Sequence, residues 1–139
     1  MNELKQAQAE LAAAIQDHSR MGEKVREYND SVADSRKIID LLVDEREAAE
    51  RDLVRGKSTP AAVAAIDKKL KEAEEKLESF QRLLTFSKEE LLSLDRQIVT
   101  ARQAVANARF AGRCHRRCRR LRRRRQRWRR PRRAAAPGR

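Results

Sequence analysis

The strongest constraint on this chain is a seven-residue repeat of apolar side chains that runs through two long segments. In the first segment, with Leu4 at position a, twelve of the fifteen a and d positions are apolar; the a residues are Leu4, Leu11, His18, Val25, Val32, Ile39, Arg46 and Leu53, and the d residues are Ala7, Ala14, Met21, Tyr28, Ser35, Leu42 and Ala49. In the second segment only Ser87 is polar among Val63, Leu70, Leu77, Leu84, Leu91, Ile98, Val105 at a and Ile66, Ala73, Phe80, Ser87, Leu94, Ala101, Ala108 at d. A heptad repeat of this length is typical of a coiled-coil seam, not of a helix in a globular domain.

Between the two segments lies a short sequence that suits a reversal of the chain. Gly56 favours the left-handed conformation that ends a helix, Ser58 or Thr59 can cap the next helix, and Pro60 suits a first helical position. A connection this short places the second helix beside the first. The sequence therefore predicts an all-α fold, a two-helix antiparallel coiled-coil hairpin within residues 1–112 that could pair into a four-helix bundle, made of helix 3–55, turn 56–59 and helix 60–110.

Two registers satisfy the heptads, with facing residues whose numbers sum to 119 or to 112. The 119 register is preferred because it gives bulky polar residues small partners: it sets His18 against Ala101 and Arg46 against Ala73. Polar residues at a positions are usually there to fix register or oligomeric state, and an arginine can also run its methylenes along the seam.

Charge is distributed unevenly along the chain. Residues 1–112 carry 19 basic and 21 acidic residues, a net charge of −2, whereas residues 113–139 hold fifteen arginines and no acidic residue. The net charge of +13 therefore comes from a C-terminal segment. We expect residues 113–139 to be an Arg-rich tail that is disordered, or helical only when bound.

The Arg-rich tail is a candidate for binding nucleic acid. Guanidinium groups bind phosphate oxygens with release of counterions, and an aromatic ring can stack on a base. The composition resembles that of arginine-rich RNA-binding peptides and protamines. The alternatives are another role for a basic tail, and a shifted reading frame in GC-rich DNA, which would also give a segment rich in Arg and devoid of Lys. The candidate residues are Arg116, Arg117, Arg119, Arg120, Arg122, Arg123, Arg124, Arg125 and Trp128.

A second set of apolar residues lies outside the a and d positions. A lone hairpin would leave these side chains in water, and although single exposed apolar residues are common, a stripe at repeat spacing indicates a contact with protein. This predicted outer stripe consists of Phe86, Leu92, Val99, Ile38 and Val43.

No pattern in the sequence indicates catalysis. Gly56-Lys57-Ser58 lacks the upstream glycine of a phosphate-binding loop. Cys114, His115 and Cys118 would be only part of a zinc site, which usually needs four ligands. We therefore expect no catalytic, cofactor-binding or metal-binding residues, no small-molecule substrate and no enzymatic activity.

The interpretation of the whole chain is a non-enzymatic coiled-coil interaction protein of the adaptor, assembly or inhibitor type. Its partner would be another protein or a second copy of itself. The alternative is a nucleic-acid-binding protein that uses the Arg-rich tail, with the hairpin as its oligomerisation module. No apolar run is long enough to cross a bilayer and no secretory signal is visible, so we expect a cytoplasmic protein without membrane contact.

Overall fold

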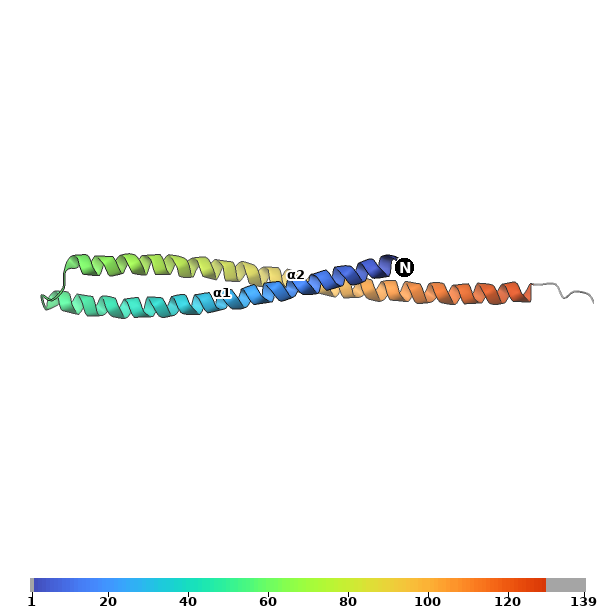
Figure 1. The fold of residues 1–139 in the computed structure, drawn as a ribbon, viewed down its shortest axis with the longest axis horizontal. Coiled ribbons are helices and arrows are strands. Elements are labelled where there is room, and N and C mark those ends of the chain that lie inside the picture. The colour runs from blue at the N-terminus through green and yellow to red at the C-terminus, as the bar shows by residue number, and fades with distance from the viewer. Residues whose placement is uncertain (1, 130–139) are drawn as a thin grey trace, which may run out of the picture. The chain divides into compact units, whose positions relative to one another are not determined.

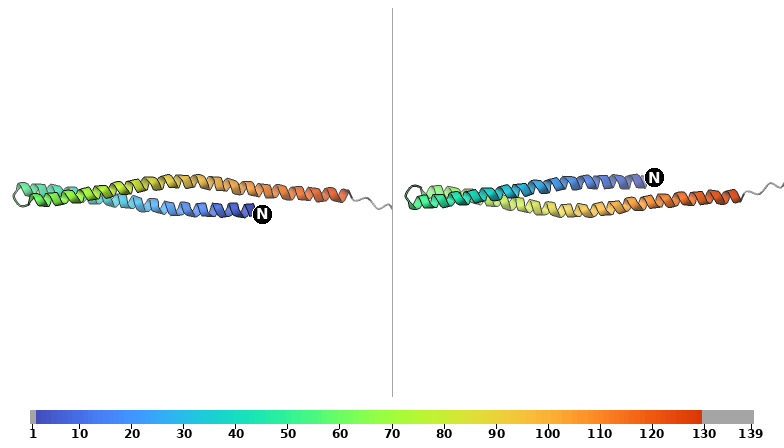
Figure 2. Two further views of the ribbon diagram at one scale, coloured as in Figure 1. Left: turned by 90° about the horizontal axis from the view of Figure 1, so that it is seen from above. Right: turned by 90° about the horizontal axis from the view of Figure 1, so that it is seen from below.

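The computed structural model describes residues 2–129 and contains two long helices. Helix α1 spans Asn2–Val54 and helix α2 spans Pro60–Trp128. They run side by side in opposite directions (Figure 1), and the further views in Figure 2 agree. The predicted all-α helical hairpin is confirmed.

The chain divides into two units along this hairpin. The terminal unit joins Met1–Ala14 to Ile98–Arg139, and the loop unit is Ile15–Gln97. In each unit a stretch of α1 lies with a stretch of α2, and the predicted division at residue 112 falls within the terminal unit.

The heptad positions form the contact between the helices. Every buried residue in the described part of the chain occupies an a or d position: Ala7, Ala14, Val32, Ser35, Leu70, Ala73, Ser87, Leu94 and Val105. None of the described side chains is fully buried, because each helix of a two-helix seam is covered on one side only. The predicted seam is thus confirmed, and it is a thin one.

Two contacts in the loop unit fix the register. The ring nitrogen Nε2 of His18 lies 2.6 Å from Oδ1 of Asp95, and Nε of Arg46 lies 2.8 Å from Oδ1 of Asp67. In both pairs the residue numbers sum to 113. In the 112 register the histidine or arginine faces a d residue of α2, and the carboxylate belongs to the next residue, at position e. The preferred 119 register is wrong here, since it would place His18 level with Ala101, about 10 Å farther along the helix at 1.5 Å per residue.

The 112 register has a physical advantage that the preference for small partners overlooked. A polar residue at a does not need a small partner when a carboxylate at the neighbouring e position can pair with it. The small residues then remain for the large apolar ones, with Ser35 facing Leu77 and Ala49 facing Val63. Such alternation of large and small side chains lets the two helices interdigitate.

The turn forms as the sequence predicted. Gly56 has a φ of 74°, its N–H donates to the Leu53 carbonyl over 3.1 Å, and the Lys57 N–H donates to the Asp52 carbonyl over 2.8 Å. These two bonds are the Schellman pattern, which satisfies the last carbonyl groups of α1. Thr59 caps α2, because its Oγ1 accepts a hydrogen bond from the Ala62 N–H at 3.4 Å.

The far end of α2 differs from the prediction. The helix does not end near residue 110 with its heptads but continues to Trp128, so residues 113–128 are helical. The heptads mark where α2 has a neighbour, whereas helix formation depends on backbone propensity, and arginine is among the better helix formers. The first proline after Pro60 is Pro131, and residues 130–139 lie outside the described residues.

We expect opposite effects from alanine at two glycines of the hairpin. Gly56→Ala forces a side chain into the left-handed region and should lower the free energy of unfolding by about 1–2 kcal/mol. Gly22→Ala, inside α1 where a Cβ would meet nothing within 4 Å, should raise it by about 0.5–1 kcal/mol. Urea unfolding followed by circular dichroism measures both, and equal effects would contradict the assigned turn.

Disulfide trapping tests the register directly. With Cys114 and Cys118 changed to serine, Ser35→Cys with Leu77→Cys joins residues that face each other in the 112 register and should cross-link within one chain under mild oxidation. The matched pair Ser35→Cys with Leu84→Cys belongs to the 119 register and should remain reduced. A cross-link in the second pair and none in the first, seen in the monomer band of a non-reducing gel, would support the 119 register instead.

Candidate functional site

The hairpin of the loop unit has two flanks, and the ion pairs between its helices lie on one of them. The polar flank is the side of the seam that carries the e positions. There Arg46 contacts both Asp67 and Glu50, the latter at 3.3 Å, and Asp95 contacts His18. All five side chains are partly exposed, so these pairs contribute well under 1 kcal/mol each to stability and mainly favour one register.

The opposite flank carries the g positions of both helices. A groove on this side is lined by residues of both helices: Ser35, Ile38 and Leu42 of α1, and Lys69, Glu72, Ala73 and Lys76 of α2. Ile38, Lys69 and Lys76 are all g residues, so the groove shows that the g positions of α1 and α2 face the same side of the hairpin.

Four large apolar side chains lie on this side, and together they define the apolar flank. Ile38 is 51% exposed and Leu41, one turn further along α1, is 63% exposed. On α2, Leu83 occupies the g position one heptad after Lys76 and is 42% exposed, and Phe86 one turn later is 63% exposed. Each helix therefore contributes two side chains to one flank.

The predicted outer stripe is only partly a single surface. All five of its residues are exposed, but Ile38 and Phe86 lie on the apolar flank, whereas Val43 at e and Leu92 at b lie toward the polar flank. Val99 belongs to the terminal unit. Sequence reasoning missed Leu41 and Leu83, which could have been found by grouping the residues at g and c, because these two positions share one side of a helix.

The Arg-rich segment of α2 forms the other candidate surface. Residues 113–129 contain eleven arginines and no acidic residue, and all are exposed. In Figure 1 this orange-to-red end of α2 continues past the first turns of α1. All the arginines predicted to bind nucleic acid, and Trp128, therefore lie on an open helix, and binding of nucleic acid stays a prediction.

Charge separates along the two units. The loop unit holds 16 basic and 19 acidic residues, which gives −3, and the last acidic residue of the chain is its Asp95. The terminal unit holds 18 basic residues against Glu3 and Glu10, which gives +16. The boundary between near-neutral and basic parts is therefore close to residue 96, well before the arginine run.

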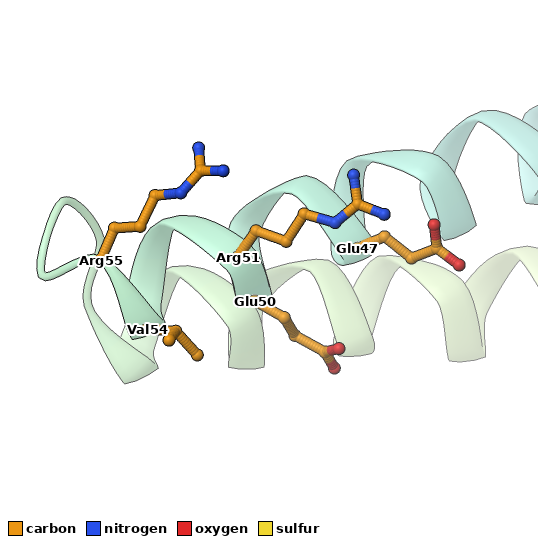
Figure 3. A pocket seen from close by; sticks show the side chains of 5 residues that line it. All are labelled: Glu47, Glu50, Arg51, Val54 and Arg55. Atoms are coloured by element: carbon orange, nitrogen blue, oxygen red, sulfur yellow. The ribbon is translucent and has the colours of Figure 1, made fainter.

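A shallow depression near the turn does not resemble a binding site. It is lined by Glu47, Glu50, Arg51, Val54 and Arg55, which all belong to the end of α1 and the start of the loop. Figure 3 shows the side chains of Arg51 and Arg55 projecting from the helix without converging on a common point. Ligand sites are usually concave and are lined by several elements.

The described residues contain no group of three or more His, Cys, Asp or Glu side chains placed to hold a metal ion. Cys114 and Cys118 are both exposed free thiols. No helix within residues 2–129 is long and apolar enough to cross a membrane.

Comparisons of the chain with protein-family models, curated proteins and solved structures give no match. The two candidate surfaces are therefore defined by the geometry and chemistry of this chain alone.

Proposed function

We propose that this protein is a non-enzymatic coiled-coil interaction protein of the adaptor, assembly or inhibitor type, and that the apolar flank is its protein-binding surface. The observation that carries the proposal is the exposure of Ile38, Leu41, Leu83 and Phe86 on one side of the hairpin, while the other side carries the ion pairs. Several large exposed apolar side chains on one side of a helix pair indicate a contact with protein more than single scattered ones do.

The energy available from this flank supports the proposal. Full burial of a leucine, isoleucine or phenylalanine side chain contributes roughly 1.5–3 kcal/mol. Four side chains that are about half exposed could therefore add several kcal/mol to an association. This exceeds the contribution of any surface ion pair on the polar flank.

The arrangement of the flank favours a helical partner, with a second copy of the chain as the first candidate. Two side chains come from each helix, so a partner must lie along both helices to cover them all. A second hairpin offers a surface of the same kind, and two hairpins joined through such faces form a four-helix bundle. Lys69, Glu72 and Lys76 beside the groove would give the contact a polar rim.

Sedimentation of the full chain tests this proposal. We expect a concentration-dependent dimer, which Leu41→Gln or Phe86→Gln should weaken about tenfold or more, because each change removes apolar area from the contact. The control is Leu92→Gln, a residue of similar exposure away from the apolar flank, which should leave the dissociation constant unchanged.

Circular dichroism must show the same helicity for all three variants, so that a loss of mass is not a loss of folding. A chain that stays monomeric at all concentrations would overturn pairing between copies. Equal weakening by Leu92→Gln would contradict the assignment of the contact to the apolar flank.

A further inference from the structure

The terminal unit carries an apolar stripe that the heptads do not explain. Along α2, Val99, Phe110 and Leu121 are separated by eleven residues each, and Trp128 follows seven residues later. They are 67%, 70%, 53% and 89% exposed. At 3.6 residues per turn these four side chains point within about 40° of one another, so they form one straight line along the helix.

Two further residues widen this line into a face. Cys114 and Cys118 are exposed and fall beside the stripe, which brings the arc to about 100°. In this part of α2 the a and d positions are occupied by Gly112, His115 and Arg119. The apolar side chains therefore no longer lie at the heptad positions that form the seam. An eleven-residue spacing follows a straight helix better than a heptad does, so this face suits a flat surface more than a supercoiled partner.

The rest of the helix surface is cationic. Of the eleven arginines from Arg113 to Arg129, all but Arg117 and Arg125 project outside the apolar arc on an ideal helix. With no acidic residue in this segment, the arginines are not neutralised within it. The helix therefore carries its large apolar side chains on one narrow arc, which also holds Gln103, Asn107, Arg117 and Arg125, and most of its arginines outside that arc.

We propose that residues 99–128 bind the surface of a membrane rich in anionic phospholipids, with the helix lying in the interface. The stripe would enter the boundary of the acyl chains, and the guanidinium groups would bind the lipid phosphates on either side. A strongly basic helix with Trp, Phe and Leu on one face has the composition of such interfacial helices. The inference goes beyond the proposed function, because it concerns the other unit and a different class of partner, and it departs from the expectation that the protein makes no contact with a membrane.

The apolar stripe favours lipid over nucleic acid as the partner of residues 99–128. A nucleic acid would use the arginines and could stack a base on Trp128, but Val99, Phe110 and Leu121 on the same line would remain in water. An anionic bilayer uses both faces at once. The helix would lie on the bilayer and not cross it, consistent with the finding that no described helix is apolar enough to span.

Trp128 gives a direct readout, because it is the only tryptophan in the chain and is 89% exposed. The full chain is titrated with vesicles of phosphatidylcholine containing phosphatidylglycerol, and with vesicles of phosphatidylcholine alone. We expect a blue shift of the Trp128 emission and co-sedimentation with the anionic vesicles only, and weaker binding as salt is raised.

Paired variants separate the two faces of the helix. Phe110→Ser and Leu121→Gln should each reduce partitioning about tenfold, and Arg123→Gln should reduce it roughly fivefold. The control Val43→Gln removes an exposed apolar side chain from the loop unit and should change nothing. Circular dichroism without vesicles checks that the variants keep their helix.

Three outcomes would overturn the proposal. The first is binding to anionic vesicles that is unaffected by Phe110→Ser and Leu121→Gln, which would be attraction of charge alone. The second is an equal blue shift on neutral vesicles. The third is absence of vesicle binding while a short DNA duplex or a single-stranded RNA binds, which would assign the arginines to nucleic acid.

Discussion

The structure depends on the pairing of two polar residues in an apolar seam with carboxylates on the opposite helix. A two-helix hairpin with many small residues can slide by one heptad and still bury apolar surface, so hydrophobic burial alone does not choose its register. His18 adds that choice, because the e residue beside it is Asp95 in one alignment and Arg102 in the other, whereas Arg46 meets a carboxylate in both, Asp67 or Glu74. The individual pairs are weak, but a choice between registers needs only a difference of a kcal/mol or so. Once the register is fixed, the assignment of every other residue to a flank follows.

The thinness of the seam explains why the described residues form open surfaces and shallow grooves. A third layer of structure is what usually covers the outer sides of a helix pair and shapes a pocket. Here the largest side chains outside the seam stay in contact with water, and the groove beside Ile38 is open along the hairpin. The features that such a molecule offers to a partner are exposed apolar area, charge and the spacing between them. Both proposed partners, a helical protein and a lipid interface, are extended surfaces for the same reason.

Much of this arrangement could be predicted from the sequence, because the signals involved are local. The heptads predicted the seam, and Gly56 and Thr59 predicted the turn. A left-handed glycine and a hydroxyl cap depend only on residues close to them in the sequence. Register was harder, because it depends on which side chains meet across the helices, and the preference for small partners ignored the reach of Asp67 and Asp95. The flanks were harder still, because Leu41 and Leu83 stand out only when the residues at g and c are grouped as one side of each helix. The end of α2 was mistaken because loss of the heptad after Ala108 was equated with loss of the helix.

The separation of charge between the two units has a kinetic consequence. The terminal unit carries +16 and the loop unit −3, so the field of an anionic surface attracts the terminal unit. Beyond a Debye length, about 8 Å at physiological salt, this attraction is screened, so it acts during the last stage of an encounter. The loop unit, at −3, gains no such attraction, so its apolar flank is not drawn to the same surface.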